Sequence, residues 1–135
     1  MRVVLGVSGG VAAYKAAELV RRLQQERLDV QVVMTQHAQE FVTPLTFAAL
    51  TGQKVITSMF GGEAPANVDS AVEHIAIAQS LDVLVIAPAS ANTLAKLARG
   101  IADDFLTTLY LATTAPVMAA PAMNVNMWEN AVTQQ

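Results

Sequence analysis

MRVVLGVSGGVAAYKAAELVRRL, residues 1–23, is the stretch of sequence that decides the fold. The apolar residues 3–7 lead through Ser8-Gly9-Gly10 into an apolar pattern of helical period, which predicts a buried strand, a glycine turn and a helix. Such a turn leaves backbone N–H groups free at the positive end of a helix, where a phosphate can bind. The glycines let a ligand approach the main chain, and the Ser8 hydroxyl adds a donor. A plain tight turn explains the stretch equally well.

The glycine spacing excludes two common nucleotide-binding loops. The dinucleotide pattern G-x-G-x-x-G cannot be aligned with GVSGGVAA, residues 6–13. A Walker A loop needs Gly-Lys-Ser/Thr after four variable residues, and that pattern is also missing here. Dinucleotides and nucleoside triphosphates are therefore disfavoured as ligands of this turn.

The composition indicates one weakly charged domain. Of the 135 residues, 53% are hydrophobic and 14% are charged, against about a quarter charged in average domains. So little charge leaves apolar surface uncovered, and we therefore expect a homo-oligomer. A net charge of −3 without a basic stripe argues against nucleic acid as a partner. Without cysteine, the sequence predicts no disulfide and no thiolate metal site.

The sequence also predicts neither a targeting segment nor a metal site. The longest apolar runs have the length of strands, and the N-terminus enters a strand without a basic region. We therefore expect a cytoplasmic protein that contacts no membrane. His37 and His74 share no paired carboxylate pattern, so no metal site is predicted. His37 lies at the start of a helical segment and is predicted to be a surface residue.

Strand-like and helix-like segments alternate along the chain. Strands are predicted at residues 3–7, 30–34, 54–58, 82–87 and 116–120, and helices at residues 12–23, 36–41, 44–50, 93–99, 101–112 and from 124 onward. Residues 60–70 predict a mobile loop, and residues 72–80 fit either an extended segment or a short helix. The alternation predicts an α/β fold over residues 1–135, a doubly wound parallel sheet with helices on both faces.

In such sheets, ligands bind at the carboxyl ends of the strands. The turns expected there contain Ser8 to Gly10, Thr35, Ser90 to Thr93, and PAMNVNMW at residues 121–128. They are rich in hydroxyls and amides and poor in positive charge, which suits a ligand held by neutral hydrogen bonds. As an alternative, Ser90 or Asn92 caps the following helix, and Thr35 is an N-cap only.

Two further features have both a chemical and a structural interpretation. His74 is the better of the two histidines as a general base, because an imidazole titrates near neutrality; a structural role is the alternative. PAMNVNMW is either a helix entry that packs on the core or an apolar wall with one buried amide. The second arrangement can grip a carboxylate or amide of a small substrate.

Taken together, these segments resemble the homo-oligomeric flavin-containing cysteine decarboxylase family. The matching pieces are GVSGGVAAYK at 6–15, EHIAIA at 73–78, APASANTLAK at 87–96, GIADD at 100–104 and PAMNVNMW at 121–128. They cover the chain from end to end, and PAMNVNMW is the most specific of them. The resemblance implies a flavodoxin-like fold, FMN bound between neighbouring subunits, and a homotrimer or an assembly of trimers.

The resemblance also implies roles for individual residues. FMN would contact Ser8, Gly9, Gly10, Val11, Thr35, Ser90, Ala91, Asn92, Thr93 and Ala122. His74 and Asn124 would be catalytic. Asn124 would hold the substrate's carboxylate, and Met123 would also bind the substrate.

The implied reaction converts 4′-phosphopantothenoylcysteine to 4′-phosphopantetheine in coenzyme A biosynthesis. The cysteinyl thiol is oxidised to a thioaldehyde with FMN, CO₂ leaves, and the resulting enethiolate is reduced again with FMNH₂. In the family, a cysteine on a C-terminal flap assists the reduction. This sequence has no cysteine and ends where the flap would begin. We therefore expect a fragment that lacks the flap and any following synthetase domain.

Three alternatives stay open. A peptidyl-cysteine decarboxylase shares the fold, the histidine and the asparagine motif but takes a peptide C-terminus as its substrate. A flavin prenyltransferase shares the fold and the FMN site, although PAMNVNMW speaks against it. A flavin-binding or regulatory subunit without turnover fits the missing cysteine.

Overall fold

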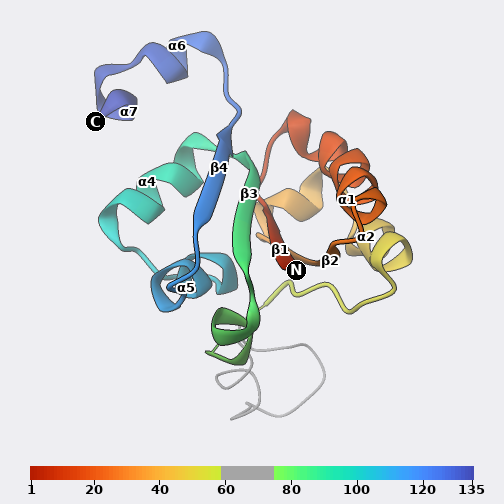
Figure 1. Cartoon of the computed structure of the whole chain (residues 1–135). Helices are drawn as coiled ribbons and strands as arrows, with labels where there is room; N and C mark the ends of the chain where they lie inside the picture. The colour runs from red at the N-terminus through yellow and green to blue at the C-terminus, as the bar shows by residue number, and fades with distance from the viewer. Residues whose placement is uncertain (59–74) are drawn as a thin grey trace.

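A four-stranded parallel sheet forms the centre of the computed structural model, which describes residues 1–58 and 75–135 (Figure 1). The strands are β1 (Arg2–Val7), β2 (Asp29–Met34), β3 (Val83–Ala89) and β4 (Val117–Pro121). Their order is β2-β1-β3-β4, and all three pairs are parallel. The chain runs from β1 outward to β2 and then returns to the other side of β1. The strand order therefore reverses between β1 and β3, which is the switch point at which ligands bind in this architecture.

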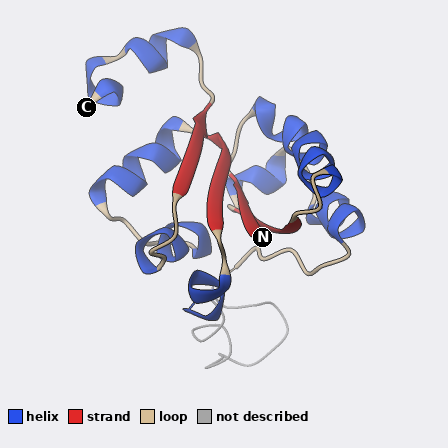
Figure 2. Cartoon of the chain, viewed as in Figure 1, coloured by secondary structure: helices blue, strands red, loops and turns tan. Residues whose placement is uncertain are grey.

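Helices cover both faces of this sheet (Figure 2). They are η1 (Val11–Tyr14), α1 (Lys15–Gln25), η2 (His37–Glu40), α2 (Pro44–Thr51), α4 (Ala91–Arg99), α5 (Phe105–Ala112), α6 (Val125–Glu129) and α7 (Ala131–Gln134), where η denotes a 3₁₀ helix; residues 75–80 are also helical. Successive strand residues point to opposite faces. Leu5 thus packs in a core with Phe47 of α2, whereas Val4 packs in a second core with Leu106 of α5. This arrangement confirms the predicted α/β, doubly wound, flavodoxin-like fold.

Several helix ends lie where the sequence places them. α2 begins with Pro44 at its first turn, after Thr43 in an extended conformation. It ends at Gly52, whose φ of 66° is in the left-handed region that favours glycine. Gly100 ends α4 in the same way, with a φ of 69°.

Other predicted boundaries are wrong, for local reasons. Residues 54–58 do not form a strand, because only Ile56 pairs with β2, through an isolated bridge to Val33. The helix predicted from residue 101 begins at Phe105, because Asp104 caps it and Thr107 completes a capping box. α4 begins at Ala91, two residues before the predicted start, because the N-cap is Ser90. The ambiguous segment 72–80 is helical over residues 75–80, and the rest of it lies outside the described residues.

β4 and the helices after it form an exposed side of the molecule. All five residues of β4 are exposed, and α6 and α7 extend beyond the end of the sheet (Figure 1). Met127 and Trp128 of α6 are 48% and 45% exposed. The prediction of a helix entry in PAMNVNMW is confirmed, because Asn124 caps α6, but the packing of this entry on the core is wrong for this chain.

Within the described ranges, no helix combines the length and the apolar character that crossing a membrane requires.

Candidate functional site

Ser8 ties together the two turns at the switch point. Its side chain is fully buried, and its hydroxyl donates a hydrogen bond to the carbonyl oxygen of Pro88 at 2.5 Å. The same oxygen atom of Ser8 accepts a hydrogen bond from the backbone N–H of Ser90 at 2.8 Å. The end of β1 is thereby fixed to the end of β3. The direct contact with a ligand predicted for the Ser8 hydroxyl does not fit this arrangement, because that hydroxyl lies beneath the turn and is already used.

The glycine turn presents unpaired backbone donors. The N–H groups of Gly9 and Gly10 have no hydrogen-bond acceptor among the described residues. A Cβ atom added to Gly10 would meet nothing within 4 Å, so packing within the described protein does not require glycine there. Its φ of 166° is extended backbone that any residue adopts. The open space at Gly10 is therefore room for a ligand to approach the main chain.

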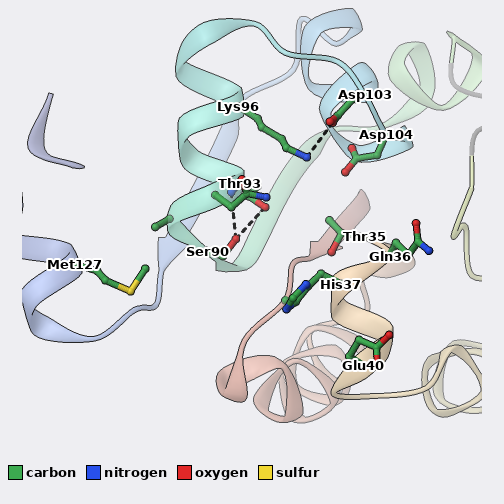
Figure 3. A pocket seen from close by; sticks show the side chains of 13 residues that line it. Thr35, Gln36, His37, Glu40, Ser90, Thr93, Lys96, Asp103, Asp104 and Met127 are labelled. Atoms are coloured by element: carbon green, nitrogen blue, oxygen red, sulfur yellow. Dashed lines mark hydrogen bonds and ion pairs between the residues drawn. The ribbon is translucent and has the colours of Figure 1, made fainter. Parts of the chain in front are cut away.

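A polar cavity of about 680 Å³ lies beside this turn (Figure 3). Its size is within the usual range of small-molecule sites. Its walls come from the turn after β1, from η2, from the start of α4 and from the loop before α5. The lining residues are Gly9, Thr35, Gln36, His37, Glu40, Ser90, Ala91, Asn92, Thr93, Lys96, Asp103, Asp104 and Met127. We call this the polar cavity.

The hydroxyls of the polar cavity also organise its walls. Thr35 accepts a hydrogen bond from the backbone N–H of Ala38 at 3.1 Å, which holds the start of η2. Ser90 caps α4 by accepting from the Thr93 N–H at 3.1 Å, and it donates to the Thr93 hydroxyl. Asn92 is exposed, and its side-chain amide has no partner among the described residues. Ser90 is thus the capping residue, and the amide of Asn92 is available to a ligand.

The charged side chains of the polar cavity are mostly acidic. Lys96 forms an ion pair with Asp103 at 3.0 Å, and its side chain is 23% exposed. The Asp104 side chain caps α5, and Glu40, which belongs to η2, lines the cavity as well. His37 also lines the polar cavity, and it is exposed at the start of η2, which confirms the prediction of a surface residue. The only signal for His37 is its place just after Thr35, at the carboxyl end of β2.

A second, more apolar cavity of about 570 Å³ also borders the glycine turn. It is lined by Gly9, Gly10, Val11, Ala12, Tyr14, Lys15, Ser90, Ala91, Ala122, Met123, Asn124 and Met127. Gly9, Ser90, Ala91 and Met127 line both cavities. The two spaces are therefore adjacent, and we call the second one the apolar cavity.

Asn124 stands at the entrance to α6. Its side-chain oxygen accepts a hydrogen bond from the backbone N–H of Met127 at 2.9 Å and so caps the helix. The NH₂ group of Asn124 has no partner among the described residues, so it can donate to a ligand. Asn124 is exposed, so the expectation of a buried amide is wrong here. The reason is that α6 extends past the sheet edge, where no described segment covers it (Figure 1).

The predicted site residues converge on these two cavities, with two exceptions. Gly9, Gly10, Val11, Thr35, Ser90, Ala91, Asn92, Thr93, Ala122, Met123 and Asn124 line one cavity or both. Ser8 lies beneath them, and His74 lies outside the described residues. In the part of the chain that the structure describes, no three His, Cys, Asp or Glu side chains are grouped so as to hold a metal ion.

Comparison with known sequences shows which family this chain belongs to. The family model described as Flavoprotein matches residues 1–135. The coenzyme A biosynthesis bifunctional protein CoaBC of Vibrio vulnificus (strain YJ016) is 47% identical over 134 residues, which are 99% of this chain and 32% of that protein. The chain thus spans about a third of the length of the curated relatives it matches.

Solved structures show the same architecture. The FMN-dependent cysteine decarboxylase SpaF superposes with a TM-score of 0.87 and is 34% identical, over 99% of this chain and 75% of that one. A variant of PPC decarboxylase in complex with pantothenoylaminoethenethiol has a TM-score of 0.78 and is 36% identical. That match covers 98% of this chain and 72% of the other.

Proposed function

We propose that this chain, which belongs to the flavoprotein family, binds FMN across its two cavities and decarboxylates the cysteine of 4′-phosphopantothenoylcysteine. The product would be 4′-phosphopantetheine, an intermediate of coenzyme A biosynthesis. The proposal is supported by the similarity to CoaBC and to the PPC decarboxylase structure. The proposal concerns this chain only, which matches about a third of the length of CoaBC.

The observation that carries the proposal is the pairing of a polar with an apolar cavity around Gly9. FMN has a phosphate at one end and a flat, largely apolar ring system at the other. The free N–H groups of Gly9 and Gly10 and the Thr35 hydroxyl suit the phosphate. Ala122 and Met123 offer an apolar wall to the ring. The residues present therefore fit the group.

Bound FMN would supply redox chemistry: it would take two electrons from the substrate thiol and would return them to the decarboxylated product, so that the net reaction is redox-neutral. Asn124 would donate its side-chain NH₂ to the substrate's carboxylate, since its oxygen is held by Met127. That hydrogen bond fixes the carboxylate beside the apolar cavity, which Met123 lines. CO₂ would then leave in the orientation that this anchor sets. His74, which lies outside the described residues, is proposed as the group that takes a proton from the substrate.

We also propose a homo-oligomer, a trimer or an assembly of trimers. Its support is the apolar surface of β4 and α6, where Met118 is 64% and Val125 is 62% exposed. Surfaces of this kind are usually covered by another subunit. Met127 extends from α6 into both cavities, so a subunit that packs on α6 would also enclose the site. A cytoplasmic location belongs to the same proposal, since coenzyme A biosynthesis is the function named for the relative.

A second candidate is decarboxylation of a cysteine carried by a peptide. The superposition on SpaF, a structure named as an FMN-dependent cysteine decarboxylase, at a TM-score of 0.87 supports cysteine as the group acted on, whatever carries it. The exposed position of Asn124 would admit a long substrate as well as a short one.

The test is a comparison of substrates with the FMN-loaded chain. Release of CO₂ from 4′-phosphopantothenoylcysteine, and not from a peptide that ends in cysteine, supports the first proposal. The reverse pattern supports the second. FMN binding without CO₂ release from either substrate would indicate a flavin-binding subunit without turnover. Light scattering tests the oligomer, and a monomer at micromolar concentration would overturn it.

A further inference from the structure

The His37 side chain covers the Gly9 end of the glycine turn. A Cβ atom added to Gly9 would lie 2.8 Å from Cγ and 2.9 Å from Cβ of His37, which is closer than such atoms pack. The His37 imidazole is therefore in contact with the Gly9 backbone, although Gly9 follows β1 and His37 follows β2. The Gly9 N–H has no acceptor among the described residues. His37 therefore lies beside an unpaired N–H donor that can bind an anion.

The ring nitrogens of His37 are also unused. Within the described residues, His37 makes one recorded ring contact, with Phe41 at a centroid distance of 5.8 Å, and no hydrogen bond or ion pair. Its ring extends from η2 into the polar cavity, across from Ser90 and Thr93 (Figure 3). Either nitrogen can therefore serve a ligand in that cavity.

The charges around the polar cavity make this position significant. Among the described residues that line it, only Lys96 and His37 can carry a positive charge, and Lys96 is paired with Asp103. Glu40 on the same turn and Asp104 across the cavity are acidic. A phosphate monoester adds up to about two negative charges. His37 is thus the unpaired side chain that can offset them.

We propose that His37 is a phosphate-binding residue of the polar cavity, and that it makes this chain select a phosphorylated flavin over the same flavin without phosphate. The role rests on the proposed FMN site. Its imidazole donates a hydrogen bond to the phosphate next to the Gly9 N–H, and the bond is charge-assisted when the ring is protonated.

The test is the affinity of the full chain for FMN and for riboflavin, measured by flavin fluorescence between pH 5.5 and 8. At pH 6 we expect His37→Gln to bind FMN about tenfold more weakly and riboflavin equally well.

His37→Phe is the matched control for packing, because it keeps a ring against Gly9 and Phe41 and removes the donor. It should lose FMN selectivity at least as strongly as His37→Gln, which keeps a neutral donor, and its melting temperature should be unchanged. An FMN-to-riboflavin ratio that is the same in all three proteins at every pH would overturn the role of His37 while leaving the FMN site intact. Absence of FMN binding by the unaltered chain would overturn the FMN site and the role of His37 together.

Discussion

The buried hydroxyl of Ser8 donates to the carbonyl oxygen of Pro88 at 2.5 Å and joins the ends of β1 and β3 beneath both cavities. The Ser90 N–H completes the link by donating to the same hydroxyl. The Ser8 backbone N–H also donates to the Pro88 carbonyl at 3.2 Å, so the side chain and the backbone of Ser8 together set the spacing between the glycine turn and the start of α4. The walls that would hold the phosphate depend on this spacing.

Ser8→Ala should therefore lower the free energy of unfolding by about 1–3 kcal/mol, because the part-buried N–H of Ser90 loses its acceptor and the buried Ser8–Pro88 bond is lost. Urea denaturation measures the change. Ser80→Ala is the matched control: the Ser80 hydroxyl makes only a 3.3 Å bond within its own helical turn. This exchange should change the stability by less than about 0.5 kcal/mol. Equal effects of the two substitutions would contradict the linking role of Ser8.

The two glycines of the turn should respond differently to alanine. Gly9→Ala forces the new Cβ against His37 and should cost about 1–3 kcal/mol of stability, a cost that His37→Ala relieves in the double variant. Gly10→Ala meets open space, so the fold should be unaffected. We expect it instead to weaken FMN binding by about tenfold, because the added methyl group occupies the approach to the main chain. FMN binding that Gly10→Ala leaves unchanged would place the ligand elsewhere.

The boundaries that the sequence predicts correctly are those set by local chemistry. Thr43-Pro44 and Gly52 mark the two ends of α2, since proline and a left-handed glycine act at their own positions. The start of α5 was missed because a capping box of Asp104 and Thr107 departs from the usual Ser/Thr and Glu/Gln pair.

Features that depend on contacts between distant segments could not be predicted in this way. The position of His37 on Gly9 follows from the parallel pairing of β1 with β2, which brings two separate turns together. The burial of Ser8 likewise depends on β3 lying beside β1. The sequence placed most candidate residues at the correct edge of the sheet, because carboxyl ends of parallel strands share that edge. It did not indicate which of them face the ligand.

Asp104→Ala tests the start of α5. Loss of the capping box should lower the free energy of unfolding by about 1–2 kcal/mol. Asp103→Ala, next to it, removes only a partly exposed ion pair with Lys96 and should cost less than about 1 kcal/mol. Thermal unfolding of both variants provides the measurement. The cap has no such role if Asp103→Ala proves the more damaging of the two.

Asn124→Asp tests the proposed anchor for the substrate's carboxylate. Aspartate can still cap α6 through its oxygen, so FMN binding and the melting temperature should be retained. It replaces the donating NH₂ by a negative charge that repels a carboxylate, and CO₂ release should fall at least a hundredfold. Asn130→Asp makes the same exchange at the N-cap of α7 and should leave the rate unchanged. Similar rates in the two variants would remove Asn124 from the substrate site.

The most direct measurement is single-turnover release of labelled CO₂ from 4′-phosphopantothenoylcysteine that carries the label in its cysteine carboxyl group. With the FMN-loaded chain we predict stoichiometric release of labelled CO₂. With His74→Asn the release should fall strongly while FMN stays bound. No release from a chain shown by fluorescence to hold FMN would contradict the proposed function.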